Sequence, residues 1–172
     1  MRTRGWFAAG LVAAALAVMP THVAAGGAAP ADRILGYWLV DTRDAIVQIQ
    51  AAGSGAARRY EGRLVWLKQS RYSEEDGADL AGKLILDSNN SDPGLRDRPL
   101  LGLKMLWGLR YDADDRQWHA GRIYNSDNGH TYQCLVWLKD AKHLVLRGYV
   151  GMPVFGGSTT WTRVHGPQPP PG

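Results

Sequence analysis

The residues best suited to chemistry gather in one polar segment, DSNNSDPGLRDRPL, which spans residues 87–100. Arg96 and Arg98 fall on the same side of an extended chain, and Pro99 favours an extended conformation for the residue before it. Two guanidinium groups on one side would form a site for a carboxylate or a phosphate. Alternatively, both arginines pair with acids of the same segment, such as Asp87, and pin a long loop. The two interpretations are compatible, because a pinned loop at a cavity entrance is where a ligand headgroup would lie.

The same segment offers two other chemistries, and its spacing favours neither. A calcium loop beginning at Asp87 would need glycine at its sixth position and glutamate at its twelfth, where the chain has Asp92 and Arg98. Asp87 and Asp92 could form an acid–base pair, but Asp92-Pro93-Gly94 is ordinary turn chemistry. The histidines beyond residue 25 show neither the H-x-x-x-H nor the H-x-H spacing typical of zinc sites. We therefore expect no metal and no cofactor, and we assign no catalytic residue.

Alternation of apolar residues with a period of two is the main indication of secondary structure. From Leu103 to Tyr111 the odd-numbered residues are all apolar or aromatic and would share one face. Similar patterns predict strands at residues 34–40, 45–50, 60–67, 83–86, 103–111, 117–124, 131–138, 143–150 and 158–164. Short polar turns separate the later strands, and Asn128-Gly129 is a strong hairpin signal.

These strands predict an all-β, antiparallel, up-and-down meander. So many strands in one flat sheet would leave exposed edges that template aggregation. Closure into a small barrel removes the edges, and a β-sandwich is the alternative. Cys134 is the only cysteine, so neither an intramolecular disulfide nor a cysteine metal site is expected.

The two ends of the chain differ in composition from the predicted barrel. Residues 1–25 have a cationic start, an apolar run and a small-residue cleavage site ending at Ala25, which is the pattern of an export signal. We expect residues 26–33 to be a mobile leader, 34–164 a single barrel domain, and the Pro-rich residues 165–172 a disordered tail. The protein is then expected in the periplasm or outside the cell, and not as a membrane-spanning chain. Removal of Arg2 and Arg4 lowers the net charge from +4 to +2, and the remaining cations are scattered, so nucleic acid is not an expected partner.

Gly36-Tyr37-Trp38 opens the first predicted strand. This Gly-x-Trp resembles the signature that lipocalins and related small ligand-binding barrels carry on their first strand. The resemblance implies that Trp38 plugs the narrow end of the barrel while Gly36 lets another backbone approach. It also implies that an arginine from a late strand lies over the indole as a cation–π partner, and Arg147 and Arg163 are the two candidates.

Longer motifs extend the resemblance over nearly all the chain that follows the signal. They are the segment from Asp87 to Leu103, GRLVWL at 62–67, GRIY at 121–124 leading to Gly129-x-Thr131-Tyr132, and LRGY at 146–149 through Gly157 to Trp161-Thr162-Arg163. In this order they resemble the bacterial domain of unknown function 2147 family. The resemblance implies an exported protein with a lipocalin-like barrel and no established activity, in which Gly129, Trp161 and Arg163 are structural. Many members have a cysteine pair before the GRLVWL block, but residues 51–62 contain none, so a disulfide or redox role does not carry over.

A ligand site is expected at the barrel mouth and interior. Its candidate residues are Asp87, Asn90, Arg96, Arg98, Trp107, Tyr124, Tyr132 and Arg147, and the aromatic residues expected inside the barrel are Tyr60, Trp66, Trp107 and Trp118. Tyr124, Tyr132 and Arg122 could form an interior polar cluster with Arg147, whose charge an acidic ligand would balance. The first hypothesis is therefore non-enzymatic binding of a small amphipathic molecule, such as an acyl chain with an acidic head. Two alternatives stay open: a module that binds another envelope protein, and a periplasmic hydrolase or isomerase using Asp87, Arg96 and Arg98.

Overall fold

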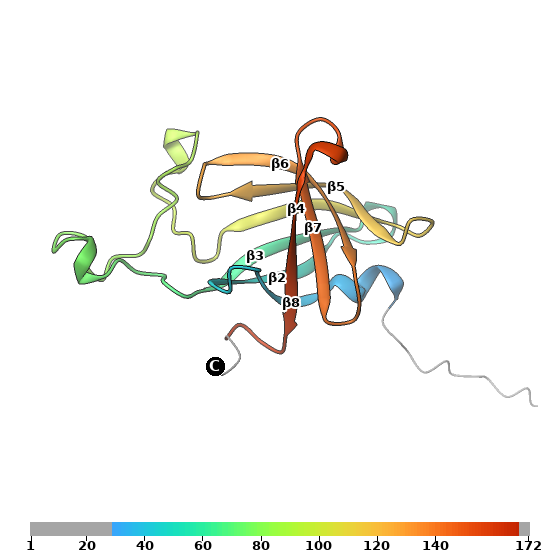
Figure 1. Cartoon of the computed structure of the whole chain (residues 1–172), viewed down its shortest axis with the longest axis horizontal. Coiled ribbons are helices and arrows are strands. Elements are labelled where there is room, and N and C mark those ends of the chain that lie inside the picture. The colour runs from blue at the N-terminus through green and yellow to red at the C-terminus, as the bar shows by residue number, and fades with distance from the viewer. Residues whose placement is uncertain (1–28, 169–172) are drawn as a thin grey trace, which may run out of the picture.

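The computed structural model describes residues 29–168, in which eight antiparallel strands close into a barrel (Figure 1). The strands are β1 (Gly36–Leu39), β2 (Ala45–Ala52), β3 (Arg59–Leu67), β4 (Lys104–Asp112), β5 (Gln117–Asn125), β6 (His130–Leu138), β7 (His143–Tyr149) and β8 (Gly157–Val164). Each strand pairs with the next one along the chain, and β8 pairs with β1 to complete the ring. The predicted up-and-down barrel is confirmed, and the alternative of a sandwich is wrong because one continuous sheet closes on itself.

The helical elements of residues 29–168 are five short 3-10 helices. They are η1 (Pro30–Ile34), η2 (Gly55–Ala57), η3 (Glu74–Asp76), η4 (Pro93–Leu95) and η5 (Pro153–Phe155). No helix in this part of the chain has the length and apolar character needed to cross a membrane.

The first of these helices, η1, overlaps the segment expected to be a mobile leader. Ile34 is buried, and its carbonyl oxygen accepts a hydrogen bond of 2.8 Å from Nε1 of Trp38. The carbonyl of Ala31 accepts one of 3.1 Å from Nε1 of Trp118. Residues 30–33 therefore pack against the barrel rather than leading freely into it. The expected signal at residues 1–25 and the last four residues of the expected tail lie outside the described residues.

Large aromatic side chains fill one end of the barrel. Trp38, Tyr60 and Trp118 are almost completely buried, and the rings of Tyr60 and Trp118 meet edge to face with their centroids 6.4 Å apart. Because each of these rings buries a large apolar area and the pair has favourable geometry, this end is a solid hydrophobic core.

Arg163, and not Arg147, covers the indole of Trp38. The guanidinium carbon of Arg163 lies 4.1 Å from the ring centroid, and its Nη1 donates to the carbonyl of Leu35 at 2.7 Å. Gly36 has a φ of +121°, and a Cβ atom there would lie 3.0 Å from that Nη1. Glycine at this position thus leaves room for the arginine that closes the barrel end.

Two details of the strand prediction are wrong. Residues 83–86 form no strand, and Leu84 and Leu86 make only isolated bridges, with Arg71 and Pro99. Regular pairing fails there because the chain meets no continuous neighbouring strand.

The strict alternation expected along β4 is also wrong. Gly108 has a φ of +79°, a conformation that glycine adopts without strain and that accompanies a bulge in the strand. As a result Leu106 and Leu109 are both fully buried, whereas Trp107 is only half-buried. A register shift between β2 and β3 likewise leaves Trp66 half-buried. Of the four aromatic residues expected inside, Tyr60 and Trp118 are buried in the core, Trp107 packs against it only partly buried, and Trp66 is not part of it.

The antiparallel order divides the connections between the two ends of the barrel. Residues 68–103, the long connection from β3 to β4, share one end with the β1–β2, β5–β6 and β7–β8 connections. The long connection projects well away from the strands in Figure 1, where it is green. We call this the open end, and the end filled by Trp38 and η1 the closed end.

Candidate functional site

Asp87 and Asn90 are the fully buried polar residues of the described chain, and they belong to one hydrogen-bonded network. Oδ1 of Asp87 accepts a hydrogen bond of 2.5 Å from the hydroxyl of Tyr124. Oδ2 accepts from Nδ2 of Asn90 at 2.7 Å and forms an ion pair with Arg98, 2.8 Å from Nε and 2.7 Å from Nη2. Nδ2 of Asn90 also lies 3.0 Å from the Tyr124 hydroxyl. We call Asp87, Asn90, Arg98 and Tyr124 the Asp87 cluster.

Backbone hydrogen bonds bring the two ends of the polar segment together. The N–H of Asp87 donates to the carbonyl of Arg98 at 2.9 Å, and the N–H of Leu100 donates to Ile85 at 3.0 Å. The turn between them is capped by Asp92, whose Oδ1 accepts from the N–H of Gly94 at 2.9 Å. These backbone hydrogen bonds therefore bring Asp87 and Arg98, eleven positions apart in the sequence, close enough to form their ion pair.

The long connection is also fixed to the β5–β6 turn. Nδ2 of Asn89 donates to the carbonyls of Ser126 and Asp127, at 3.1 and 3.2 Å. Gly129 has a φ of +70°, and a Cβ atom there would lie only 1.9 Å from the carbonyl oxygen of Asn89. Gly129 thus serves the hairpin, as predicted from Asn128-Gly129, and also admits the backbone of the long connection.

The contacts of the Asp87 cluster indicate a structural clamp, which holds the long connection against strand β5. The Asp87 side chain has no exposed surface, and both of its oxygens already accept hydrogen bonds. Burial, and then the hydrogen bond to Asp87, raise the pKa of Tyr124 above its ordinary value, so its hydroxyl remains a donor. The guanidinium of Arg98 lies over the ring of Tyr124, 5.5 Å from its centroid. A substrate would have to open this network before it could reach Asp87.

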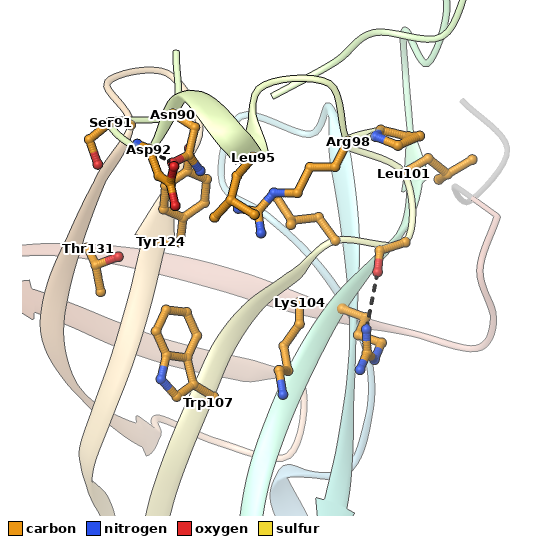
Figure 2. Close-up of a pocket in the computed structure, with 15 residues that line it drawn as sticks. Asn90, Ser91, Asp92, Leu95, Arg98, Leu101, Lys104, Trp107, Tyr124 and Thr131 are labelled. Carbon is orange, nitrogen blue, oxygen red and sulfur yellow. Dashed lines mark hydrogen bonds between the residues drawn. The ribbon is translucent and has the colours of Figure 1, made fainter. Parts of the chain in front are cut away.

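A cleft of about 780 Å³ opens beside the Asp87 cluster (Figure 2). In Figure 2, Trp107, Lys104 and Thr131 project from the barrel strands into one side of the cleft, and Leu95 and Arg98 overhang it from the long connection. Register pairs Trp107 with the exposed residue Arg122, so this cleft lies on the outer face of the barrel.

The positive charge of this outer cleft is partly neutralised. Nζ of Lys104 lies 3.3 Å from Glu61, and Nη2 of Arg63 lies 3.7 Å from the same carboxylate. The outer cleft is therefore lined mainly by the ring of Trp107 and by apolar residues such as Leu95, and these two cations are paired with Glu61.

A second cavity, of about 930 Å³, lies inside the open end of the barrel. Its apolar lining includes Leu64, Ile123, Leu146 and Trp161, which come from four different strands. Polar residues of the open-end connections surround its mouth, and they are Thr42, Asp44, Lys68, Gln69, Ser126 and Asp127. Tyr124 contributes to the walls of both this cavity and the outer cleft.

The structure brings five of the eight candidate ligand residues together. Asn90, Arg98, Trp107 and Tyr124 line the outer cleft, and Asp87 lies directly behind it. Arg96 is exposed, and its Nε donates to the carbonyl of Asn90 at 2.7 Å, so it braces the loop rather than facing a cavity with Arg98.

The expected interior cluster of Tyr124, Tyr132, Arg122 and Arg147 is wrong. Arg122 is exposed. Arg147 donates to the carbonyls of Pro153 and Val154, at 2.6 and 3.2 Å, in the β7–β8 connection. Tyr132 is half-buried, and its hydroxyl accepts from Nδ2 of Asn128 at 3.0 Å. The bulges in β4 and β5 change which residues face inward, and a strict period of two cannot follow that change.

Sequence reasoning missed the lining of the barrel cavity and one polar trio at the closed end. Ile123 and Leu146 have an ordinary strand pattern, which marks burial but not a cavity. Asp32 accepts from Arg58 at 2.7 Å and from Tyr60 at 2.8 Å, and these two hydrogen bonds, Tyr60 first, lower the pKa of Asp32. No local motif joins Asp32 to residues 26 and 28 positions later.

One group of possible metal ligands lies in the β4–β5 turn, at the closed end. Ligand atoms of Asp112, Asp115 and His119 are within 4.8 Å of one another, and both carboxylates are exposed. Exposed acidic groups of this kind are common without an ion, and we assign the turn no function.

The closed antiparallel barrel, with its plugged end and its apolar cavity, has a lipocalin-like fold. A structure described as protein HP1028 from the human pathogen Helicobacter pylori, belonging to the lipocalin family, is similar with a TM-score of 0.56. The two sequences are 20% identical over 76% of this chain and 82% of the other, a level at which the likeness shows the fold alone. A family model described as an uncharacterized protein conserved in bacteria (DUF2147) matches residues 36–163, and the chain belongs to that family. No curated protein matches the sequence.

Proposed function

We propose that this protein binds a small amphipathic molecule, with an acyl chain or similar apolar group inside the open end of the barrel. The observation that carries the proposal is the cavity of about 930 Å³ lined by Leu64, Ile123, Leu146 and Trp161. Ligand sites of small molecules are typically about 300–1,000 Å³, mostly apolar, with a few polar groups at fixed places. The cavity and its polar mouth have this composition.

The cavity mouth carries one cation, Lys68, and two acids, Asp44 and Asp127, and an acidic headgroup would pair with the cation. Lys68 is an exposed cation on the mouth, and among residues 29–168 no carboxylate lies within ion-pair distance of it. Asp44, on the same mouth, accepts a hydrogen bond from Thr42 at 2.5 Å. A carboxylate or phosphate head would therefore find Lys68 available while its chain enters the barrel.

A substitution that fills the cavity tests the proposal. Thr159 lines the cavity, whereas Thr160 is its neighbour on the opposite face of β8. We expect Thr159→Phe to weaken the binding of a fluorescent fatty acid at least about tenfold, because the added ring occupies the space of the chain, and Thr160→Phe to leave binding unchanged. Displacement by unlabelled fatty acid measures the specific signal, and native mass spectrometry of gently purified protein identifies any resident ligand.

The headgroup requires a separate comparison. We expect Lys68→Gln to weaken binding of a fatty acid more than binding of the matching fatty alcohol, which has no charge. No displaceable signal from wild-type protein, together with a clean unliganded mass, would contradict the binding function. Equal losses for acid and alcohol would contradict only the role of Lys68.

The proposed function also includes export. The support is the sequence of residues 1–25, with its cationic start, apolar run and cleavage site near Ala25. We propose that the barrel acts in the periplasm or outside the cell. The intact mass of protein recovered from the periplasmic fraction tests this, since cleavage after Ala25 removes a defined mass.

A further inference from the structure

The connection between β7 and β8 carries the most exposed apolar side chains of the described residues. Val150, Met152, Val154 and Phe155 are 73%, 59%, 69% and 77% exposed. They lie within six consecutive residues around η5, and the loop stands out at one edge of the barrel in Figure 1, where it is orange to red. Because these apolar side chains are highly exposed on a loop that stands out from the barrel, they are suited to insertion into a partner surface.

Part of the backbone of this loop is hydrogen-bonded within the loop or to Arg147. The N–H of Phe155 donates to Met152 and the N–H of Gly156 donates to Pro153, both at 3.1 Å. Arg147 donates to the carbonyls of Pro153 and Val154 from below the tip. These contacts give the turn around η5 a defined shape.

The charge around the tip is positive. Arg147 lies directly behind the tip, and from residue 141 to residue 172 the sequence contains no acidic residue. The other two cations of this stretch, Lys142 and Arg163, are at the closed end of the barrel. Arg122 is exposed, and register through β6 places it in the same row as Tyr149, immediately before the tip. Apolar residues at a tip with arginines behind them match the layers of a membrane surface, which has acyl chains below anionic headgroups.

We propose that residues 150–155 dock this protein on a membrane surface that contains anionic lipid. Phe155, Val154, Met152 and Val150 enter the boundary between headgroups and acyl chains, and Arg147 and Arg122 remain at the level of the phosphates. The β7–β8 connection is at the open end, and Leu146 and Thr159, on its two flanking strands, line the cavity. Docking would thus hold the cavity mouth close to the lipid. The docking itself does not depend on whether the cavity holds a ligand.

Co-sedimentation with vesicles tests the docking. Protein expressed from the full sequence, purified without detergent and of known intact mass, is mixed with vesicles of phosphatidylethanolamine and phosphatidylglycerol, or of phosphatidylcholine alone. We expect binding to the anionic vesicles that falls at least about tenfold in Val154→Ser/Phe155→Ser, since two exposed apolar side chains are lost without a change in charge. The matched control is Leu80→Ser/Leu101→Ser, which removes two exposed leucines from the long connection and should bind like the wild type. All variants share one N-terminus, so any contribution of residues 1–28 is common to them.

Three results would overturn the docking. One is no binding of wild-type protein to anionic vesicles, and another is equal binding by the two double variants. The third is a concentration-dependent dimer that the Val154/Phe155 substitutions dissolve while vesicle binding is absent, which would assign the tip to contact between protein chains. Displacement of a fluorescent fatty acid in buffer without vesicles is measured on the same variants. We expect it to be unchanged, so that failure of docking and failure of ligand binding are distinguished.

Discussion

Replacing Asp87 by asparagine tests whether the Asp87 cluster is a structural clamp. The substitution preserves the shape of the side chain and removes its charge. An amide oxygen facing Arg98 and Asn90 can still accept from them, and the amide nitrogen can donate to the oxygen of Tyr124. The ion pair and the charge-assisted hydrogen bonds are lost, and neutral hydrogen bonds replace them.

The size of the effect follows from burial. A hydrogen bond to a charged group contributes about 1.5–3 kcal/mol, and breaking a buried ion pair from one side costs about 3–5 kcal/mol. The side chain of Arg98 is 35% exposed whereas that of Asp87 is 0% exposed, so water offsets part of the loss on the arginine side. Asparagine also retains partners. We therefore expect the free energy of unfolding to fall by about 2 kcal/mol, or Tm to fall by roughly 6 °C.

Urea unfolding followed by tryptophan fluorescence measures the global change, and limited proteolysis of residues 68–103 measures local opening of the long connection. Asp92→Asn is the matched control, because Asp92 is exposed and caps only the N–H of Gly94. Asparagine caps about as well, so this variant should lie within about 0.5 kcal/mol of the wild type. Equal unfolding midpoints and equal proteolysis for the two variants would refute the clamp and return Asp87 to the candidates for chemistry.

Three further predictions concern single positions. Gly129→Ala should destabilise the protein by about 2 kcal/mol or more in urea unfolding, because its Cβ would lie 1.9 Å from the carbonyl oxygen of Asn89; an unchanged midpoint would contradict this close approach. Arg163→Met should cost about 3 kcal/mol by the same assay, since it removes the cation over Trp38 and the hydrogen bond to Leu35; a cost below about 1 kcal/mol would contradict it. Burial raises the pKa of Cys134 to about 12, so the native thiol should not react with a thiol-specific reagent at pH 8 and should react once urea unfolds the chain; rapid reaction of the native protein would contradict its burial.

The barrel was predictable from the sequence because its strands are local. Most of the strands are short apolar-rich or β-branched runs bounded by polar turns, and antiparallel neighbours in sequence pair in space. The short strand β1 was found through Gly36 and Trp38, whose pattern matched a known signature. Residues 83–86 have a similar apolar pattern, but they lie in a connection without a neighbouring strand and therefore form only isolated bridges. An apolar pattern shows that a segment can form a β-strand, but the strand forms only where a neighbouring strand is present to pair with it.

The candidate site was predictable only in part, for a different reason. The polar segment could be recognised as a loop whose arginines pair with its own acids, and Asp87 and Arg98 do pair. Tyr124 could not be placed as the third member, because its hydroxyl meets Asp87 across 37 residues of sequence. Arg147 could not be separated from Arg163, since both are arginines on late strands. Which of the two covers Trp38 depends on the register of β8 against β1, where Trp38 faces Arg163.

The division between the two barrel ends explains how such a protein can be stable and still hold a cavity. Trp38, Tyr60 and Trp118 with Arg163 fill the closed end, so the ring of strands does not need a filled open end to remain closed. At the open end, the Asp87 cluster fixes the long connection to β5 from the outside. Asp87, Asn90 and Arg98, which fix the connection, are not among the residues that line the cavity beside Ile123. A clamp on the outer face thus allows a cavity on the inner face of the same strand.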